Sequence, residues 1–214
     1  MDDKDAIGEF HTRYYHDQRT WSSTCWMGIA ALKCPLDLWI YQELLWQVRP
    51  EVIIESGTAA GGTAFFLATM CDLLGQGEVI TIDVVPVPGR PQHARLTYIT
   101  ANCLAEETVR SIRAACIGRS PVMVILDSDH HEGHVVAEME RYADLVTPGS
   151  YLIVEDTNLD RYGLAPAHGP GPLQAVQAFL ARRTDFVQDN GCERHLLTFN
   201  PGGYLKRVGV GGSG

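Results

Sequence analysis

The sequence predicts a single α/β domain in which a mostly parallel sheet of seven strands carries helices on both faces. Short runs of β-branched and aliphatic residues alternate with helical patterns, as expected for βαβ units. The strands are apolar throughout, which is typical of a sheet that is buried on both sides. The chain closes with a hairpin, so we expect the last strand to be antiparallel.

Five strands are predicted before the hairpin, at residues 52–54, 79–82, 96–99, 122–126 and 151–154. Helices are predicted at residues 37–45, 63–74, 106–117, 133–146 and 172–183. The first helix is expected to begin at Asp37 as its N-cap, after Pro35, and the second to end at Gly75. The hairpin is predicted from strands at 195–199 and 204–208, which are joined by a turn over Asn200–Gly203.

Three segments are expected along the chain. Residues 1–35 lack a clean period but contain several aromatic side chains. They are interpreted as an N-terminal extension that packs on the domain or on another subunit of a homo-oligomer and forms part of a substrate wall. Residues 36–208 form the ligand-binding domain, and the glycine-rich residues 209–214 form a flexible tail.

Composition limits the classes of function. The 214 residues suffice for one domain, and the net charge of -9 argues against nucleic acid or an anionic membrane as a partner. The chain contains no apolar run of ~18 residues and shows no signal-peptide pattern at its start, so we expect a cytoplasmic protein. The six cysteines form no CxxC pair and are interpreted as free thiols.

A glycine-rich loop, Gly57-Thr58-Ala59-Ala60-Gly61-Gly62, joins the first strand to a helix. Glycine lets backbone pass close to a ligand, and the amides that open a helix favour an anionic group. Asp83 ends the next strand, where a carboxylate can accept hydrogen bonds from ribose hydroxyls. The loop follows neither the dinucleotide spacing nor the phosphate-loop pattern. Together these features predict a nucleoside cofactor.

Acidic side chains gather after the last two parallel strands. Asp127-Ser128-Asp129-His130-His131 follows one of them, and Glu155-Asp156 follows the other. Carboxylate oxygens suit Mg²⁺, with water or substrate oxygens completing its shell. Three nearby histidines, His130, His131 and His134, keep zinc or an iron site open as alternatives.

Several long motifs resemble the cephalosporin hydroxylase family, and the resemblance covers nearly the whole chain from about Trp21. The motifs span residues 33–43, 54–62, 126–130, 146–157 and 203–207. Despite its name, this family is similar to class I methyltransferases that use S-adenosylmethionine, and to Mg²⁺-dependent catechol and sugar O-methyltransferases. The resemblance therefore implies a Rossmann-like methyltransferase domain with S-adenosylmethionine and Mg²⁺ as cofactors.

The resemblance also implies roles for individual residues. The cofactor-binding residues would be Glu55, Gly57, Thr58, Gly61 and Gly62 at the methionine end, Asp83 at the ribose, Asn102 at the adenine and Asp127 at the amino group, together with Ser128. Glu155 and Asp156 would bind the metal. For the first metal ligand, the family pattern favours Asp129 and the spacing in catechol enzymes favours Asp127; we assign it to Asp129.

The expected reaction is methylation of a hydroxyl on a small molecule, in antibiotic or other secondary metabolism. A vicinal diol or a catechol would chelate the metal, with Asp129 as its ligand and His130 or His131 as general base. The loop 158–171 is expected to cover the acceptor. Two alternatives stay open: a hydroxylase, and an accessory protein that binds S-adenosylmethionine for a partner oxygenase.

Overall fold

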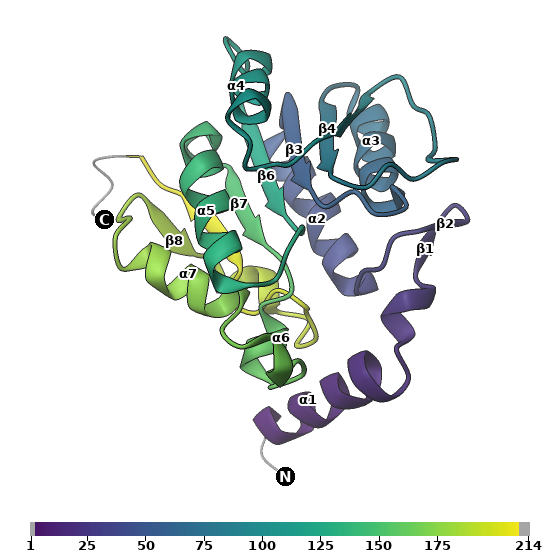
Figure 1. The fold of residues 1–214 in the computed structure, drawn as a ribbon, viewed down its shortest axis with the longest axis vertical. Helices are drawn as coiled ribbons and strands as arrows, with labels where there is room; N and C mark the ends of the chain where they lie inside the picture. Colours follow the sequence, from purple (N-terminus) through teal and green to yellow (C-terminus); the bar gives the residue numbers. More distant parts are fainter. Residues whose placement is uncertain (1–2, 210–214) are drawn as a thin grey trace.

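The computed structural model describes residues 3–209, and its centre is a seven-stranded sheet in the order β5-β4-β3-β6-β7-β9-β8 (Figure 1). The strands are β3 (Val52–Ser56), β4 (Glu78–Asp83), β5 (Leu96–Thr100), β6 (Val122–Leu126), β7 (Tyr151–Val154), β8 (Phe186–Gln188) and β9 (Tyr204–Arg207). The first five are parallel, and β9 is antiparallel to both β7 and β8. The predicted seven-stranded fold class is confirmed.

Helices cover both faces of the sheet. They are α1 (Asp3–His11), α2 (Pro35–Val48), α3 (Gly62–Leu74), α4 (Glu106–Ala115), α5 (Glu132–Tyr142), α6 (Asn158–Arg161) and α7 (Pro172–Leu180). One core cluster joins α4, α5 and α7 to one face, and the other joins α2 and α3 to the opposite face. The strands are buried on both sides, which explains why they lack polar alternation.

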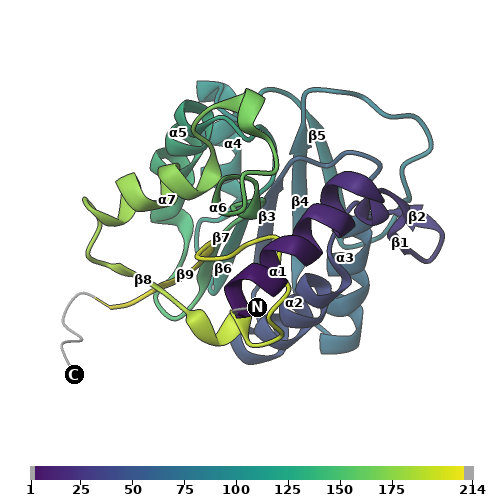
Figure 2. The same ribbon diagram turned by 90° about the horizontal axis from the view of Figure 1, so that it is seen from below.

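The N-terminal segment wraps around the carboxyl end of the sheet. Helix α1 ends beside α6 (Figures 1 and 2), where His11 stacks on Tyr162 with ring centroids 4.3 Å apart. A π-helical turn (Thr12–Asp17), a 3-10 turn (Thr20–Ser23) and a small ribbon of β1 (Cys25–Trp26) and β2 (Ile29–Ala30) follow. No helix within residues 3–209 is long and apolar enough to cross a membrane.

Two predicted details are wrong, and Asp37 explains both. The sequence predicts that the strand at residues 195–199 pairs with the last strand, but the hairpin partner of β9 is β8, at Phe186–Gln188. Asp37 is buried and accepts hydrogen bonds from the Thr198 hydroxyl and, over 2.8 Å, from the Phe199 amide. The polar groups of Thr198 and Phe199 therefore hydrogen-bond to the Asp37 side chain and not to a neighbouring strand. Helix α2 begins at Pro35 after Cys34, so Asp37 is not its N-cap.

Within the domain, the other predicted elements are confirmed with end shifts of a few residues. Helices α4, α5 and α7 end earlier than predicted, at Ala115, Tyr142 and Leu180. Helix α3 ends at Gly75, whose φ of 74° lies in the left-handed region, as predicted. For the predicted flexible tail, residues 210–214 lie outside the described residues.

Candidate functional site

The glycine loop between β3 and α3 is fixed by close backbone packing. Gly57 has a φ of 91°, and a Cβ atom there would lie 1.9 Å from the carbonyl oxygen of Asp127. A Cβ atom on Gly62 would lie 2.3 Å from the carbonyl oxygen of Ala30. Glycine is therefore required at both positions, where the loop passes the end of β6 and the N-terminal segment.

Asp83, at the end of β4, ties the glycine loop to the neighbouring strand. Its Oδ2 atom accepts a hydrogen bond from the Ala59 amide over 2.8 Å, and its Oδ1 atom accepts one from the Val85 amide over 2.9 Å. The guanidinium of Arg90 donates to the Ala59 carbonyl over 2.9 Å. The carboxylate is thus held in a fixed orientation at the mouth of the loop.

Two cavities meet at this loop and share Gly57, Asp83 and Ser128. The first, of about 210 Å³, reaches the acidic residues Asp127 and Asp156. The second, of about 240 Å³, reaches Asn102, Cys103, Asp129 and His134. Pockets for drug-sized ligands usually measure ~300–1,000 Å³. A nucleoside that carries an amino-acid tail therefore needs both cavities.

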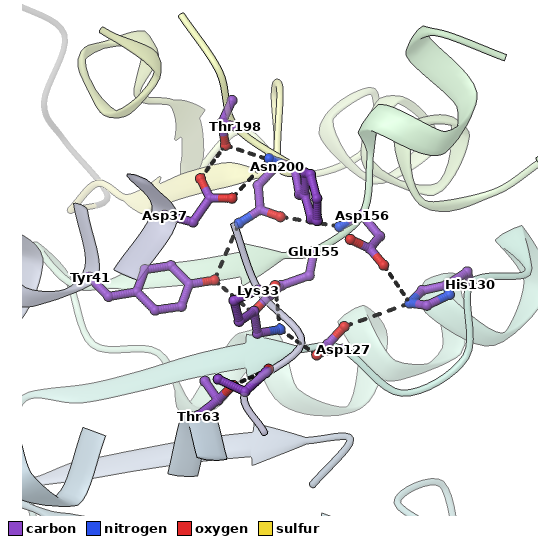
Figure 3. A network of polar contacts seen from close by, with 12 residues as sticks. Lys33, Asp37, Tyr41, Thr63, Asp127, His130, Glu155, Asp156, Thr198 and Asn200 are labelled. Carbon is purple, nitrogen blue, oxygen red and sulfur yellow. Dashed lines mark hydrogen bonds and ion pairs between the residues drawn. The ribbon is translucent and has the colours of Figure 1, made fainter. Parts of the chain in front are cut away.

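Asp127, His130 and Asp156 come together at the first cavity (Figure 3). The Nε2 atom of His130 lies 3.3 Å from Oδ2 of Asp156 and 3.6 Å from Oδ1 of Asp127. Asp156 has a φ of 58°, and its amide donates to the Oδ1 atom of Asn200 over 3.1 Å. This contact stabilises a strained backbone at the site, and strained residues of this kind concentrate in functional sites.

The charges of this cluster shift the pKa values of its members. Burial would lower the pKa of His130, but Asp127 and Asp156 outweigh burial and raise it to about 9. Burial raises the pKa of Asp156, whereas for Asp127 the attraction of Lys33 and His130 outweighs burial and lowers the pKa. Because the negative charges of Asp127 and Asp156 repel each other, a cation bound beside them would be stabilised.

Asp129, predicted as the first metal ligand, lies outside this cluster. Its Oδ1 atom accepts hydrogen bonds from the His131 amide over 2.8 Å and from His131 Nδ1 over 2.6 Å. The side chains of Asp129 and His131 are both largely exposed. Asp127, at the end of β6, is the carboxylate that lies beside Asp156.

Glu155 and Glu55 lie behind the cavities, not in their walls. Lys33 forms ion pairs with both Asp127 and Glu155, and the Tyr41 hydroxyl donates to Glu155 Oε1 over 2.7 Å (Figure 3). Glu55 is buried and accepts a hydrogen bond of 2.5 Å from the Thr81 hydroxyl. Thr81 in turn contacts Thr58 of the glycine loop over 2.6 Å. Glu55 therefore supports the loop from beneath.

Neither Lys33 nor Tyr41 was predicted from the sequence to belong to the site. Both belong to the motif at residues 33–43, and Lys33 directly follows the apolar residues 29–32. A lysine in such a position could have indicated a buried ion pair, because an ionised lysine is rarely buried without a partner.

The second cavity is lined by polar groups from three segments. Asn102 accepts a hydrogen bond from the Leu104 amide over 2.8 Å, which fixes the turn after β5. Ser128 donates to buried Glu138 over 2.8 Å and lies 3.0 Å from Nε2 of His134. Asn102 and Ser128, both predicted to bind the cofactor, thus line one cavity.

Aromatic side chains also line the first cavity. Tyr15 stacks on Trp21 with centroids 5.4 Å apart and meets Phe199 edge-on at 5.4 Å. The N-terminal aromatics were predicted as a wall, and the structure places Tyr15 and Trp21 there. The loop 158–171, also predicted to cover the acceptor, contributes no lining residue to either cavity.

A parallel sheet with an antiparallel strand inserted near its edge, together with a glycine loop and an acid after the next strand, defines the class I methyltransferase fold. Solved structures agree. An apo structure of CmcI has a TM-score of 0.69 at 24% identity and covers 88% of this chain and 78% of its own. The MycE methyltransferase in complex with Mg, SAH and mycinamycin VI has a TM-score of 0.61 at 15% identity, covering 97% of this chain and 56% of its own.

The chain belongs to the rhamnosyl O-methyltransferase/CmcI family, whose model matches residues 18–208. The rhamnosyl O-methyltransferase of Mycobacterium leprae is 34% identical over 215 residues, which cover 95% of this chain and 91% of the relative. The rhamnosyl O-methyltransferase of Mycobacterium tuberculosis is 34% identical over 213 residues, covering 95% and 86%. The predicted family, and the methyltransferase class that it implies, are confirmed.

Proposed function

We propose that this protein transfers the methyl group of S-adenosylmethionine to a hydroxyl of a small molecule, with Mg²⁺ as a second cofactor. The observation that carries the proposal is the cluster of Asp127, His130 and Asp156, which faces a cavity shared with the glycine loop. Among similar structures, CmcI has been solved as an Mg–SAM form, with a TM-score of 0.68 at 24% identity.

The residues fit S-adenosylmethionine. A long, bent cofactor would occupy both cavities and pass over Gly57, where only a hydrogen atom fits between the loop and β6. Asp83 would accept hydrogen bonds from the ribose hydroxyls, and Asn102 and Ser128 would line the adenine end. When bound, this cofactor supplies a methyl group on a positively charged sulfur.

The residues also fit a divalent cation. Asp127 and Asp156 offer hard oxygen ligands, and the Nε2 atom of His130 lies 3.6 Å and 3.3 Å from their oxygens. We assign the first ligand to Asp127 instead of Asp129, because the carboxylate of Asp129 is bonded to His131. When bound, Mg²⁺ supplies positive charge that makes a nearby hydroxyl more acidic.

His130 is the proposed general base. It accepts the proton of the acceptor hydroxyl at Nε2, while the oxygen attacks the methyl carbon and the carbon–sulfur bond breaks to release the thioether product. Asp127 and Asp156 would hold the divalent cation, whose charge would offset the carboxylate charge that raises the pKa of His130. This would favour the neutral imidazole that a base requires.

The proposed acceptor is a sugar hydroxyl. The relatives that are 34% identical are named rhamnosyl O-methyltransferases. The cavity that Asp127 and Asp156 line also has an aromatic surface, which suits the apolar face of a sugar ring; it consists of Tyr15, Trp21 and Phe199. The expected vicinal diol, the homo-oligomer and a role in antibiotic biosynthesis stay predictions.

Two binding and activity measurements test the proposal. Titration calorimetry should detect binding of S-adenosylhomocysteine, and Asp83→Asn should weaken it at least tenfold. The matched control Asp72→Asn removes an exposed carboxylate on α3 that pairs with Arg95 and should leave binding unchanged. A methyl-transfer assay with a rhamnoside panel should show turnover. Cofactor binding without turnover on any acceptor would instead favour the accessory protein.

A further inference from the structure

A second group of metal-ligating side chains, which we call the Cys103 cluster, lies on the wall of the second cavity. Cys103 lies in the turn after β5, and His134 and Glu138 are four residues apart on α5, on the same face of that helix. One ligand atom from each of the three residues lies within 4.8 Å of the other two. None of the three residues belongs to the site proposed for Mg²⁺.

The separations within the Cys103 cluster suit tetrahedral coordination. The Sγ atom of Cys103 lies 3.7 Å from Nε2 of His134 and 3.2 Å from Oε1 of Glu138. Nε2 of His134 lies 3.7 Å from Oε2 of Glu138. In a tetrahedral zinc site with Zn–S of ~2.3 Å and Zn–N and Zn–O of ~2.0–2.2 Å, neighbouring ligand atoms are about 3.3–3.6 Å apart. The observed separations lie close to that range, so little movement would bring the three ligands onto one ion.

Glu138 is a buried carboxylate that lacks a strong cationic partner. It is fully buried, and the ion pairs of the described residues join it to His134 and to no lysine or arginine. Its Oε1 atom accepts hydrogen bonds from the Ser128 hydroxyl over 2.8 Å and from the Cys103 thiol over 3.2 Å. Burial raises the pKa of Glu138, because an ionised carboxylate is costly to remove from water. A cation bound to Glu138 would offset that cost.

The donor set favours Zn²⁺ over Mg²⁺. A thiolate and an imidazole are ligands that zinc accepts, whereas Mg²⁺ requires oxygen ligands. Zn²⁺ would replace the proton that the Cys103 thiol donates to Glu138, so that a zinc–thiolate bond forms and the proton passes to solvent. The fourth ligand would come from the Ser128 side, where the hydroxyl lies 3.0 Å from Nε2 of His134, or from water in the second cavity.

We propose that Cys103, His134 and Glu138 form a zinc site, and that zinc bound there opposes binding of the methyl donor. Cys103 and His134 line the second cavity, and buried Glu138 lies behind them. Asn102 and Ser128, which the proposed function assigns to the adenine end of S-adenosylmethionine, line the same cavity. A hydrated ion at this wall takes up space that the adenine needs. The zinc site is independent of the proposed function, whereas the antagonism rests on it.

Co²⁺ is the probe that identifies the site, because a cobalt–thiolate bond absorbs in the near ultraviolet. The site proposed for Mg²⁺ contains no sulfur ligand and cannot give this band. Titration of the full chain with Co²⁺ should produce the band, and Zn²⁺ should remove it. Cys103→Ser should lack the band, and His134→Gln should bind Co²⁺ at least tenfold more weakly. Cys25→Ser removes an exposed cysteine and should keep the band at wild-type strength.

Titration calorimetry with S-adenosylhomocysteine tests the antagonism. When Zn²⁺ is present at ten times its own dissociation constant, mutually exclusive binding should raise the apparent dissociation constant of the cofactor product by about tenfold. This effect of Zn²⁺ should be lost in Cys103→Ser and in His134→Gln, and should persist in Cys25→Ser. Persistence of the effect in Cys103→Ser would show that Zn²⁺ acts elsewhere.

The results separate this inference from the proposed function. If no Co²⁺ band appears, or if it persists in Cys103→Ser, the zinc site is wrong whatever the protein methylates. If the band depends on Cys103 but Zn²⁺ leaves S-adenosylhomocysteine binding unchanged, the antagonism is wrong. If the wild-type protein binds no S-adenosylhomocysteine, the proposed function fails, and the Co²⁺ band still decides the zinc site. His134 is partly exposed, so His134→Gln tests the site even if Cys103→Ser does not fold.

Discussion

The Nε2 atom of His130 lies 3.3 Å from the Oδ2 atom of Asp156, so the proposed base and a proposed metal ligand share one edge of the site. The base comes from the loop after β6, and the ligand comes from the end of β7. Because these strands are adjacent and parallel, their carboxyl ends deliver both side chains to the same cavity.

The first prediction distinguishes Asp127 from Asp129. Asp127→Asn should abolish measurable Mn²⁺ binding and reduce methyl transfer by at least 100-fold, because Asp127 faces Asp156 and His130. Asp129→Asn makes the same chemical change two residues away and should alter both quantities by less than threefold. If Asp129→Asn lost metal binding and Asp127→Asn did not, Asp129 would be the first metal ligand.

The second prediction concerns the base. His130→Gln should lower turnover by ~10²–10⁴-fold, because it removes the proton acceptor. The affinity for S-adenosylhomocysteine should stay within threefold of wild type. The neighbouring exposed residue provides the control: His131→Gln should retain most of the activity. Equal losses in the two variants would remove His130 from the mechanism.

The third prediction concerns Gly57. In Gly57→Ala, the new methyl group would overlap the Asp127 carbonyl, so the loop must move. Thermal or urea unfolding should show a loss above ~3 kcal/mol, together with loss of cofactor binding. Gly75→Ala has a similar φ of 74° but open space around it, and should cost only ~1–2 kcal/mol and spare binding. Comparable losses of stability in the two variants would mean that the positive φ, and not the contact with the Asp127 carbonyl, accounts for the cost at Gly57.

The fourth prediction is a pH dependence set by His11, which is buried at the end of α1. Burial lowers its pKa from 6.5 to about 4. The unfolded chain therefore binds this proton more readily than the folded one between these values. The stabilisation is complete above pH 6.5 and is lost as the pH falls toward 4, to a limit of ~3 kcal/mol.

The pH dependence of the free energy of unfolding checks this sign. His11→Phe keeps a ring against Tyr162 but cannot be protonated. Its stability should fall less steeply than that of wild type between pH 6.5 and pH 4. Parallel curves for the two proteins would show that His11 does not contribute.

The fold could be predicted because its signals are local. Five apolar runs became the parallel strands β3 to β7, and glycine and proline mark several helix ends. The strand predicted at residues 195–199 is wrong, because the run of apolar residues there is typical of a strand. Its hydrogen bonds go to Asp37, which is distant in sequence, so no local pattern could reveal them.

The site was predictable only in part, for a related reason. Asp83 ends β4, Asp127 follows β6 directly and Asp156 lies two residues after β7, so topology brings all three to one edge of the sheet. Lys33 and Tyr41 reach the site because the N-terminal segment and α2 pack against the sheet. The choice between Asp127 and Asp129 depends on the turn after β6, where Asp129 folds back onto His131.

The most direct test is methyl transfer from labelled S-adenosylmethionine to a rhamnoside acceptor, measured with Mg²⁺ and after treatment with a chelator. We predict turnover that falls by at least 100-fold on chelation and returns when Mg²⁺ is added back. Transfer that continues undiminished in the chelator would contradict metal-assisted methylation at Asp127, His130 and Asp156.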